Sequence, residues 1–148
     1  MKKIIVISIV AVFLFIPFFV STADSEGNLS IQITGFNSDK GEVLVTLFTS
    51  KDGFPTEADK AHKKLTGHIK NGKSHVVIND ISYGEYAVAV LHDENKNGKM
   101  DRSIFGMPKE GNGASNNPES SGPPKFEDAK FSFNSNISSI DINLKYIE

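Results

Sequence analysis

Apolar and polar residues alternate with a period of two along several short segments, and this period constrains the fold more than any other feature. Leu29, Ile31 and Ile33 alternate with polar residues, and Gly35 then interrupts the run. Successive side chains of a strand point to opposite faces, so this alternation predicts a strand with one buried face. The first ordered element after a short polar lead is therefore expected to be a β-strand.

Further segments carry strand-like patterns, bounded by turn residues. They are residues 42–49, 65–70, 73–79, 85–92, 129–133 and 138–146. Residues 42–49 are apolar on both faces, which predicts a strand at the centre of a sheet. With the first segment this makes about seven strands joined mostly by short turns.

Local turn and helix signals complete this prediction. The Asn71-Gly72 pair lies between residues 65–70 and 73–79 and predicts a hairpin, because a type I′ turn needs positive φ at both central positions. Residues 56–64 can form about two helical turns, with a threonine in the capping position. The whole pattern predicts an all-β fold, an antiparallel β-sandwich of immunoglobulin-like or transthyretin-like type with one long ordered loop.

The first 23 residues are expected to be a signal peptide. Residues 1–3 are a short basic start, residues 4–20 are apolar, and residues 21–23 are small, as a signal peptidase requires. An uncleaved membrane anchor is the alternative, since the apolar run reaches the lower edge of a spanning length. Pro17 and the small residues favour cleavage. Residues 24–148 would then form a single exported domain, periplasmic or extracellular, with no membrane span.

Composition excludes several classes of function. The chain has no cysteine, so disulfides, thiol catalysis and zinc–thiolate sites are impossible, and an exported domain without cysteines is typical of bacteria. The formal net charge is −2, with 16 basic and 18 acidic residues interspersed. Because no basic stripe is present, nucleic acid is not an expected partner.

Residues 93–128 lack strand periodicity and form a long insertion loop. Loops of this length are uncommon in compact domains and often carry function. The loop contains few large apolar residues, namely Met100, Ile104, Phe105, Met107 and Phe126. Burial of apolar surface would hold such a segment poorly, so we expect another interaction to order it.

The start of this loop has the spacing of a calcium-binding loop. Calcium takes six to eight oxygen ligands, and a tight loop supplies them best from every second residue. Gly98 would allow the sharp turn at the sixth position. The predicted oxygen donors are the side chains of Asp93, Asn95, Asn97 and Asp101 and the backbone carbonyl of Lys99.

The match to the helix–loop–helix calcium motif ends after nine positions. Ile104 stands where that motif needs a bidentate glutamate, and no amphipathic helices flank the loop. We therefore expect a calcium loop inserted between strands and completed by Glu110, Asp128 or backbone oxygens, with a dissociation constant on the order of 10⁻⁵ to 10⁻³ M. The alternative is a solvated turn whose Asp, Asn and Gly residues cap one another.

Several segments of the chain together resemble a known bacterial family. These are residues 92–101, 105–111, 115–117 and 122–129 in the long loop, with residues 83–88 and 29–35 in the strands. The chain resembles the family called domain of unknown function 2141. The resemblance implies an exported, single-domain bacterial protein with no assigned biochemical activity. Asn112 and Ala114 stand where family members often carry aromatic residues, which argues against an aromatic sugar-binding platform there.

Two classes of function are compatible with these features. The first is a binding or structural module of the bacterial envelope, with a calcium-stabilised loop as its contact surface and an unknown envelope or extracellular partner. A scaffold without any ligand is a variant of it. The second is a small secreted hydrolase that uses His92 and loop carboxylates.

The sequence favours the non-enzymatic class. Ser115 shares the loop, but His92 and Asp93 are strand neighbours, whose side chains point to opposite faces, and no Gly-x-Ser-x-Gly elbow is present. His92 is expected to brace the loop through a hydrogen bond. A glycosidase-like pair among the carboxylates of Glu110, Glu127 and Asp128 lacks aromatic platforms, since the chain has no tryptophan. No catalytic or organic cofactor-binding residue is therefore assigned.

Overall fold

The computed structural model describes residues 25–119 and 122–147. The predicted signal peptide lies outside these residues. Within the described ranges, no helix has the length and apolar character needed to cross a bilayer.

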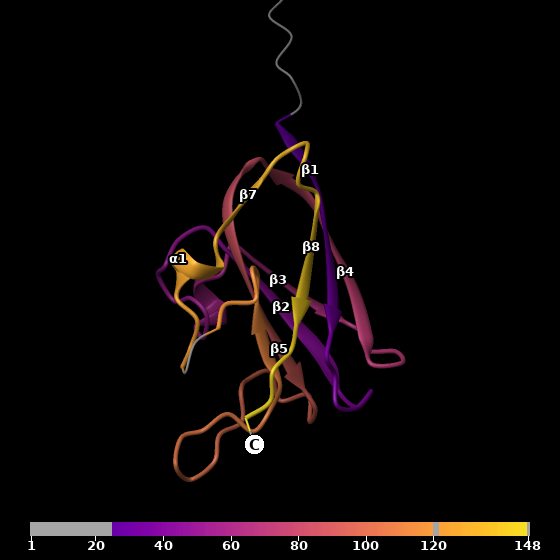
Figure 1. Cartoon of the computed structure of the whole chain (residues 1–148), viewed down its shortest axis with the longest axis vertical. Helices are drawn as coiled ribbons and strands as arrows, with labels where there is room; N and C mark the ends of the chain where they lie inside the picture. The colour runs from indigo at the N-terminus through magenta and orange to yellow at the C-terminus, as the bar shows by residue number, and fades with distance from the viewer. Residues whose placement is uncertain (1–24, 120–121, 148) are drawn as a thin grey trace, which may run out of the picture.

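Two β-sheets pack face to face, which confirms the predicted all-β fold (Figure 1). The strands are β1 (Glu26–Thr34), β2 (Glu42–Phe48), β3 (Lys63–Gly67), β4 (Lys73–Ser82), β5 (Gly84–Asp93), β6 (Asn112–Ala114), β7 (Phe131–Phe133) and β8 (Ser139–Asn143). One sheet has the order β4-β1-β8, and the other has the order β3-β2-β5-β6 with β7 also on β5. The two helical elements of the described chain are short: the 3₁₀ turn η1 (Ala58–Lys60) and the single-turn helix α1 (Phe126–Ala129).

The core lies between the sheets and is built from the alternate positions that the sequence indicates. It contains Leu29, Ile31 and Ile33 of β1, Val43, Val45 and Leu47 of β2, Tyr86, Val88 and Val90 of β5, and Phe133 and Ile142 near the C-terminus. Burying one such aliphatic side chain stabilises a fold by about 1.5–3 kcal/mol relative to leaving it exposed. The central position predicted for β2 is confirmed, because this strand pairs with both β3 and β5.

A second, smaller apolar cluster covers part of the outer face of the larger sheet. Ala87 of β5 packs there with Ala114 and Ala129. The rings of Phe54 and Phe126 close this cluster edge to face, with centroids 5.8 Å apart. The outer face of β5 is thus covered near its start, while Leu91 toward its end is partly exposed.

Two details of the sheets differ from the expectation. β8 runs parallel to β1, with Ile31 opposite Ile140, so the sandwich is not wholly antiparallel. The described chain has eight strands rather than about seven, because the short strand β6 forms inside the predicted loop. Its sequence, Asn-Gly-Ala, is too short to show a period.

The helix predicted over residues 56–64 is also wrong. Only the turn η1 forms there, and Ala61 already has an extended backbone. Leu65 then pairs with Val45 as part of β3. Two isolated helical turns are unstable in water, so pairing with an available sheet edge decides the local structure.

The Asn71-Gly72 turn is confirmed, but it does not join a regular hairpin. Both residues have positive φ, +53° and +70°, and their backbone N–H groups donate to the carboxylate of Asp39 at 2.8 and 2.7 Å. The flanking strands separate at once, since β3 pairs with β2 and β4 pairs with β1. The turn therefore carries the chain from one sheet to the other.

Candidate functional site

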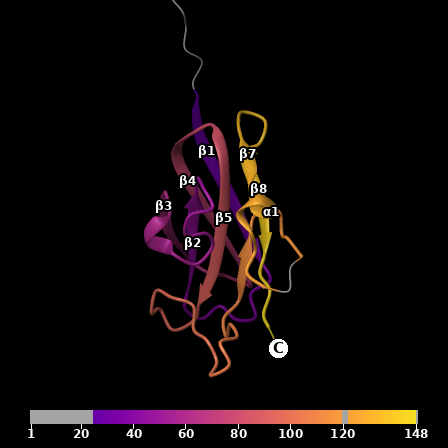
Figure 2. The ribbon, with the colours of Figure 1, turned by 90° about the vertical axis from the view of Figure 1, so that its left-hand side faces the viewer.

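The long loop leaves the end of β5 at Asp93 and returns to the same sheet at β6. Figure 2 shows residues 94–111 in orange at one end of the sandwich, beside the C-terminal segment and opposite the start of β1. Its apolar side chains point outward, because Ile104 is 94% and Phe105 is 84% exposed. Packing in the core therefore does not order this loop.

A buried carboxylate holds the first part of the loop. Asp93 is 0% exposed, and its two oxygens accept hydrogen bonds from the backbone N–H groups of Asn97 at 3.1 Å and Gly98 at 2.7 Å. Gly98 has a φ of +77°, the left-handed conformation that glycine adopts without strain. This is the sharp turn that the spacing predicts.

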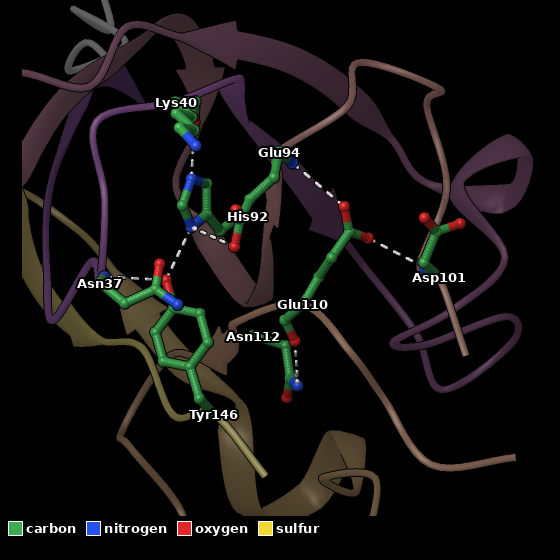
Figure 3. Close-up of polar contacts among 8 residues, drawn as sticks. All are labelled: Asn37, Lys40, His92, Glu94, Asp101, Glu110, Asn112 and Tyr146. Carbon is green, nitrogen blue, oxygen red and sulfur yellow. Dashed lines mark hydrogen bonds and ion pairs between the residues drawn. The ribbon is translucent and has the colours of Figure 1, made fainter. Parts of the chain in front are cut away.

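A second buried carboxylate ties the two sides of the loop together. Glu110 is 5% exposed and accepts from the backbone N–H of Glu94 at 3.0 Å and from that of Asp101 at 2.9 Å (Figure 3). Lys109 N also donates to the carbonyl of Asp101 at 2.9 Å. Buried backbone N–H groups need such acceptors, so Glu110 serves as the loop's internal anchor.

The structure brings three of the predicted oxygen-bearing side chains together, those of Asn95, Asn97 and Asp101. The side-chain amides of Asn95 and Asn97 donate to the two carboxylate oxygens of Asp101, at 2.7 and 2.9 Å. Asn97 Oδ1 in turn accepts from the backbone N–H of Lys99 at 3.0 Å. The described chain holds no group of three His, Cys, Asp or Glu side chains arranged for a metal, so any cation here would depend on amide and carbonyl oxygens.

Two of the suggested ligands are placed differently from this turn. The carboxylate of Glu110 faces backbone N–H groups rather than the asparagines. Asp128 lies on α1, where its carbonyl accepts from Asn116. Glu127 is on the same helical turn and forms an ion pair with Lys130 at 3.0 Å, so the three carboxylates weighed for a glycosidase are not assembled as a pair in a cleft.

His92 is fully buried, and both of its ring nitrogens have partners (Figure 3). Nε2 lies 2.7 Å from the carbonyl oxygen of Lys40, which can only accept, so Nε2 carries a proton. In the neutral ring, Nδ1 then accepts from the Tyr146 hydroxyl at 2.7 Å. The same hydroxyl accepts from the backbone N–H of Asn37 at 3.2 Å. His92 therefore donates a bracing hydrogen bond, but to Lys40 in the connection between β1 and β2 and not, as predicted, to the long loop.

Sequence reasoning did not find Tyr146 as a partner of this site. Its only signal is its place at the end of the last alternating segment, which indicates burial but not a contact with His92. Burial raises the pKa of the Tyr146 hydroxyl above its usual value of 10.0. Ser115 is likewise buried, and its hydroxyl accepts from Val88 N at 2.9 Å and donates to the carbonyl of Ala129.

A groove beside the loop was also not foreseen from the sequence. It has a volume of about 830 Å³ and lies over the outer face of β2, β5 and β6. One wall is formed by the loop from Gly98 to Pro108, and the other includes Asn117 and Pro118. The two buried carboxylates thus hold the segment that forms one side of this groove.

Comparison with known proteins identifies the family of the chain. A family model described as an uncharacterized protein conserved in bacteria (DUF2141) matches residues 31–141. No curated protein and no solved structure matches the chain. The matched region runs from within β1 to within β8 and includes the whole of the long loop. The chain therefore belongs to the DUF2141 family.

Proposed function

We propose that this protein is an exported binding module of the bacterial envelope whose loop, residues 93–110, is stabilised by calcium. The observation that carries this proposal is the convergence of the Asn95, Asn97 and Asp101 side chains. They lie on a turn whose backbone is held by the Asp93 carboxylate and whose Gly98 is left-handed. Calcium prefers such oxygen donors and tolerates irregular geometry. The basic and apolar N-terminus and the small residues before Asp24 support export.

The donor set fits a weakly bound calcium ion. The negative charge of the donor set would come from the two carboxylates at the turn, those of Asp93 and Asp101. The asparagine amides now present nitrogen to Asp101, and rotating each amide by half a turn presents oxygen to the same point. When bound, the cation would replace hydrogen bonds inside the turn with metal–oxygen contacts.

The hydrolase alternative has less support. His92 has no free ring nitrogen with which to accept a substrate proton, because one nitrogen faces Lys40 and the other faces Tyr146. Ser115 is fully buried and bonded to the backbone on both sides. A general base must reach the proton that it removes, and this arrangement favours structural roles for both residues.

Thermal melting of residues 24–148 in EDTA and in calcium tests the metal proposal. With a dissociation constant of about 0.1 mM, calcium at about 1 mM should stabilise the fold by roughly 1.4 kcal/mol. For a domain of this size the melting temperature should rise by about 3–6 °C. Magnesium should produce a smaller rise, because it requires stricter octahedral geometry.

The matched variants are Asp101→Asn and Asp141→Asn. Both remove one carboxylate charge, but Asp141 lies on the exposed surface of β8, away from the turn. The calcium-dependent rise should be lost in Asp101→Asn and retained in Asp141→Asn. An unchanged melting temperature of the wild-type protein at any millimolar calcium concentration would refute the metal site. The mass of the exported protein should separately show cleavage after Ala23.

A further inference from the structure

The floor of the groove beside the long loop is the outer face of the two central strands, where Leu44 and Leu91 are partly exposed and Ala89 is 7% exposed. Leu44 and Thr46 of β2 and Ala89 and Leu91 of β5 line it. These residues occupy the outward positions of two central strands, and α1 covers only the start of that face. An apolar surface on the outer side of a central strand normally packs against something.

The charged side chains that line the groove all carry the same sign. They are Lys99, Arg102 and Lys145, and the described lining contains no carboxylate. None of the three forms an ion pair with a carboxylate of the described residues, whereas Lys60, Lys64 and Lys130 do. The groove is thus a cationic site on a chain whose acidic residues outnumber its basic ones.

Two of these cations are fixed at opposite walls of the groove. Arg102 Nη1 donates to the carbonyl of Gly106 at 2.9 Å, within the loop. Lys145 Nζ donates to the carbonyl of Pro118 at 3.2 Å, on the other side. Both carbonyls belong to residues that line the groove. Each head group keeps further N–H donors for an anion, because guanidinium has five and ammonium three.

We propose that this groove binds a small amphipathic anion, with an unbranched apolar chain on the floor of the sheet and a carboxylate between the cations. Its volume is within the range of about 300–1,000 Å³ that is typical of small-molecule sites. A mostly apolar lining with a few placed polar groups is also typical of such sites. The proposal rests on the assignment of this protein as a binding module, but it does not depend on calcium.

Decanoate and decyltrimethylammonium are suitable probes, because they share a chain length and differ in the sign of their charge. Each is titrated below its micelle-forming concentration into ¹⁵N-labelled residues 24–148 in EDTA. Decanoate should bind saturably with a dissociation constant of about 1 mM or lower. The largest amide shifts should map to the groove lining, at Ala89 and Leu91 of the floor and at Gly113 of β6. Decyltrimethylammonium should give no saturable shifts there.

Charge variants decide whether the cations act as proposed. Arg102→Gln and Lys145→Gln should each weaken decanoate binding by about tenfold or more, the scale of one charge-assisted hydrogen bond. Lys109→Gln is the matched control, since Lys109 is an exposed cation of the same loop outside the groove lining. The amide spectra of the variants also report whether each is folded.

The proposal is overturned if decanoate does not bind, if both probes bind equally, or if the control variant loses as much affinity as the other two. Shifts that map outside the groove would also overturn it. Because the titration is done without calcium, its failure would leave the calcium-dependent melting result intact. Conversely, a chain that binds decanoate but shows no calcium effect would keep the groove and lose the metal site.

Discussion

Replacing Glu110 by glutamine tests whether one buried carboxylate holds the long loop in place. In the native chain its two oxygens accept from the backbone N–H groups of Glu94 and Asp101. Glutamine keeps one acceptor oxygen but turns an NH₂ group toward the other N–H, so one bond is lost and a buried donor has no partner. Hydrogen bonds to charged groups are worth about 1.5–3 kcal/mol each. We therefore expect Glu110→Gln to reduce the free energy of unfolding by roughly 2–3 kcal/mol.

Urea denaturation measures this loss, and it is a large part of the roughly 5–15 kcal/mol that stabilises a typical domain. The melting temperature should fall by about 6–15 °C. Hydrogen exchange adds a local readout, since the amides of Glu94 and Asp101 should lose protection in the variant. Glu119→Gln is the control, because Glu119 is an exposed carboxylate in the same insertion. A loss below about 0.5 kcal/mol, equal to that of the control, would show that Glu110 does not anchor the loop.

Two other perturbations address the bracing of this end of the sandwich. Tyr146→Phe should lower stability by about 1–2 kcal/mol in urea, because His92 and the Asn37 backbone N–H lose a partner. Burial raises the pKa of Tyr146 in the folded state. The contribution of its protonated hydroxyl to the free energy of unfolding is therefore complete below the unfolded pKa near 10, and it is lost as the pH rises through the folded pKa. Melts at about pH 8 and 11 should therefore differ less in the variant than in the wild type. Gly41→Ala should prevent folding or lower the free energy of unfolding by more than about 3 kcal/mol. Gly41 has a φ of +75°, and a Cβ there would overlap the carbonyl oxygen of Asp93. The soluble yield and the urea midpoint measure this effect.

The elements that could be predicted from the sequence are those in which a short alternation of apolar and polar residues marks the buried positions. The inward positions of β1, such as Ile31, and of β2, such as Val45, follow directly from alternation. Both faces of β2 are apolar because one faces the core and the other faces a small cluster and the groove. A period of two indicates a strand, but it does not indicate which strand will be its neighbour.

The pairings that could not be predicted depend on distant parts of the chain. Residues 63 and 64 fall in the predicted helix, yet they form the start of β3 because they pair with the edge of β2. The turn at Asn71 is encoded locally, yet the separation of its two strands into different sheets is not. The parallel pairing of β8 with β1 joins the two ends of the domain, and no short segment carries a signal for it.

The candidate site also combines local features that the sequence could predict with distant contacts that it could not. The turn from Asp93 to Gly98 was predictable because its hydrogen bonds join residues four and five positions apart. The contact between His92 and Tyr146 joins residues 54 positions apart, so spacing could not indicate it. No single segment of the sequence indicates the groove, since its floor comes from two strands and its walls come from two loops.

The order of the loop and the use of the groove have a common physical origin. Ile104 and Phe105 contribute almost nothing to the core, since both are nearly fully exposed, so the loop is ordered by hydrogen bonds to Asp93 and Glu110. These anchors are hydrogen bonds within the chain itself, so the wall of the groove does not need a ligand to supply them. A preorganised wall spares a ligand the entropic cost of ordering a segment of this length. Two buried carboxylates thus hold the loop that carries Lys99 and Arg102 beside the outer face of the sheet.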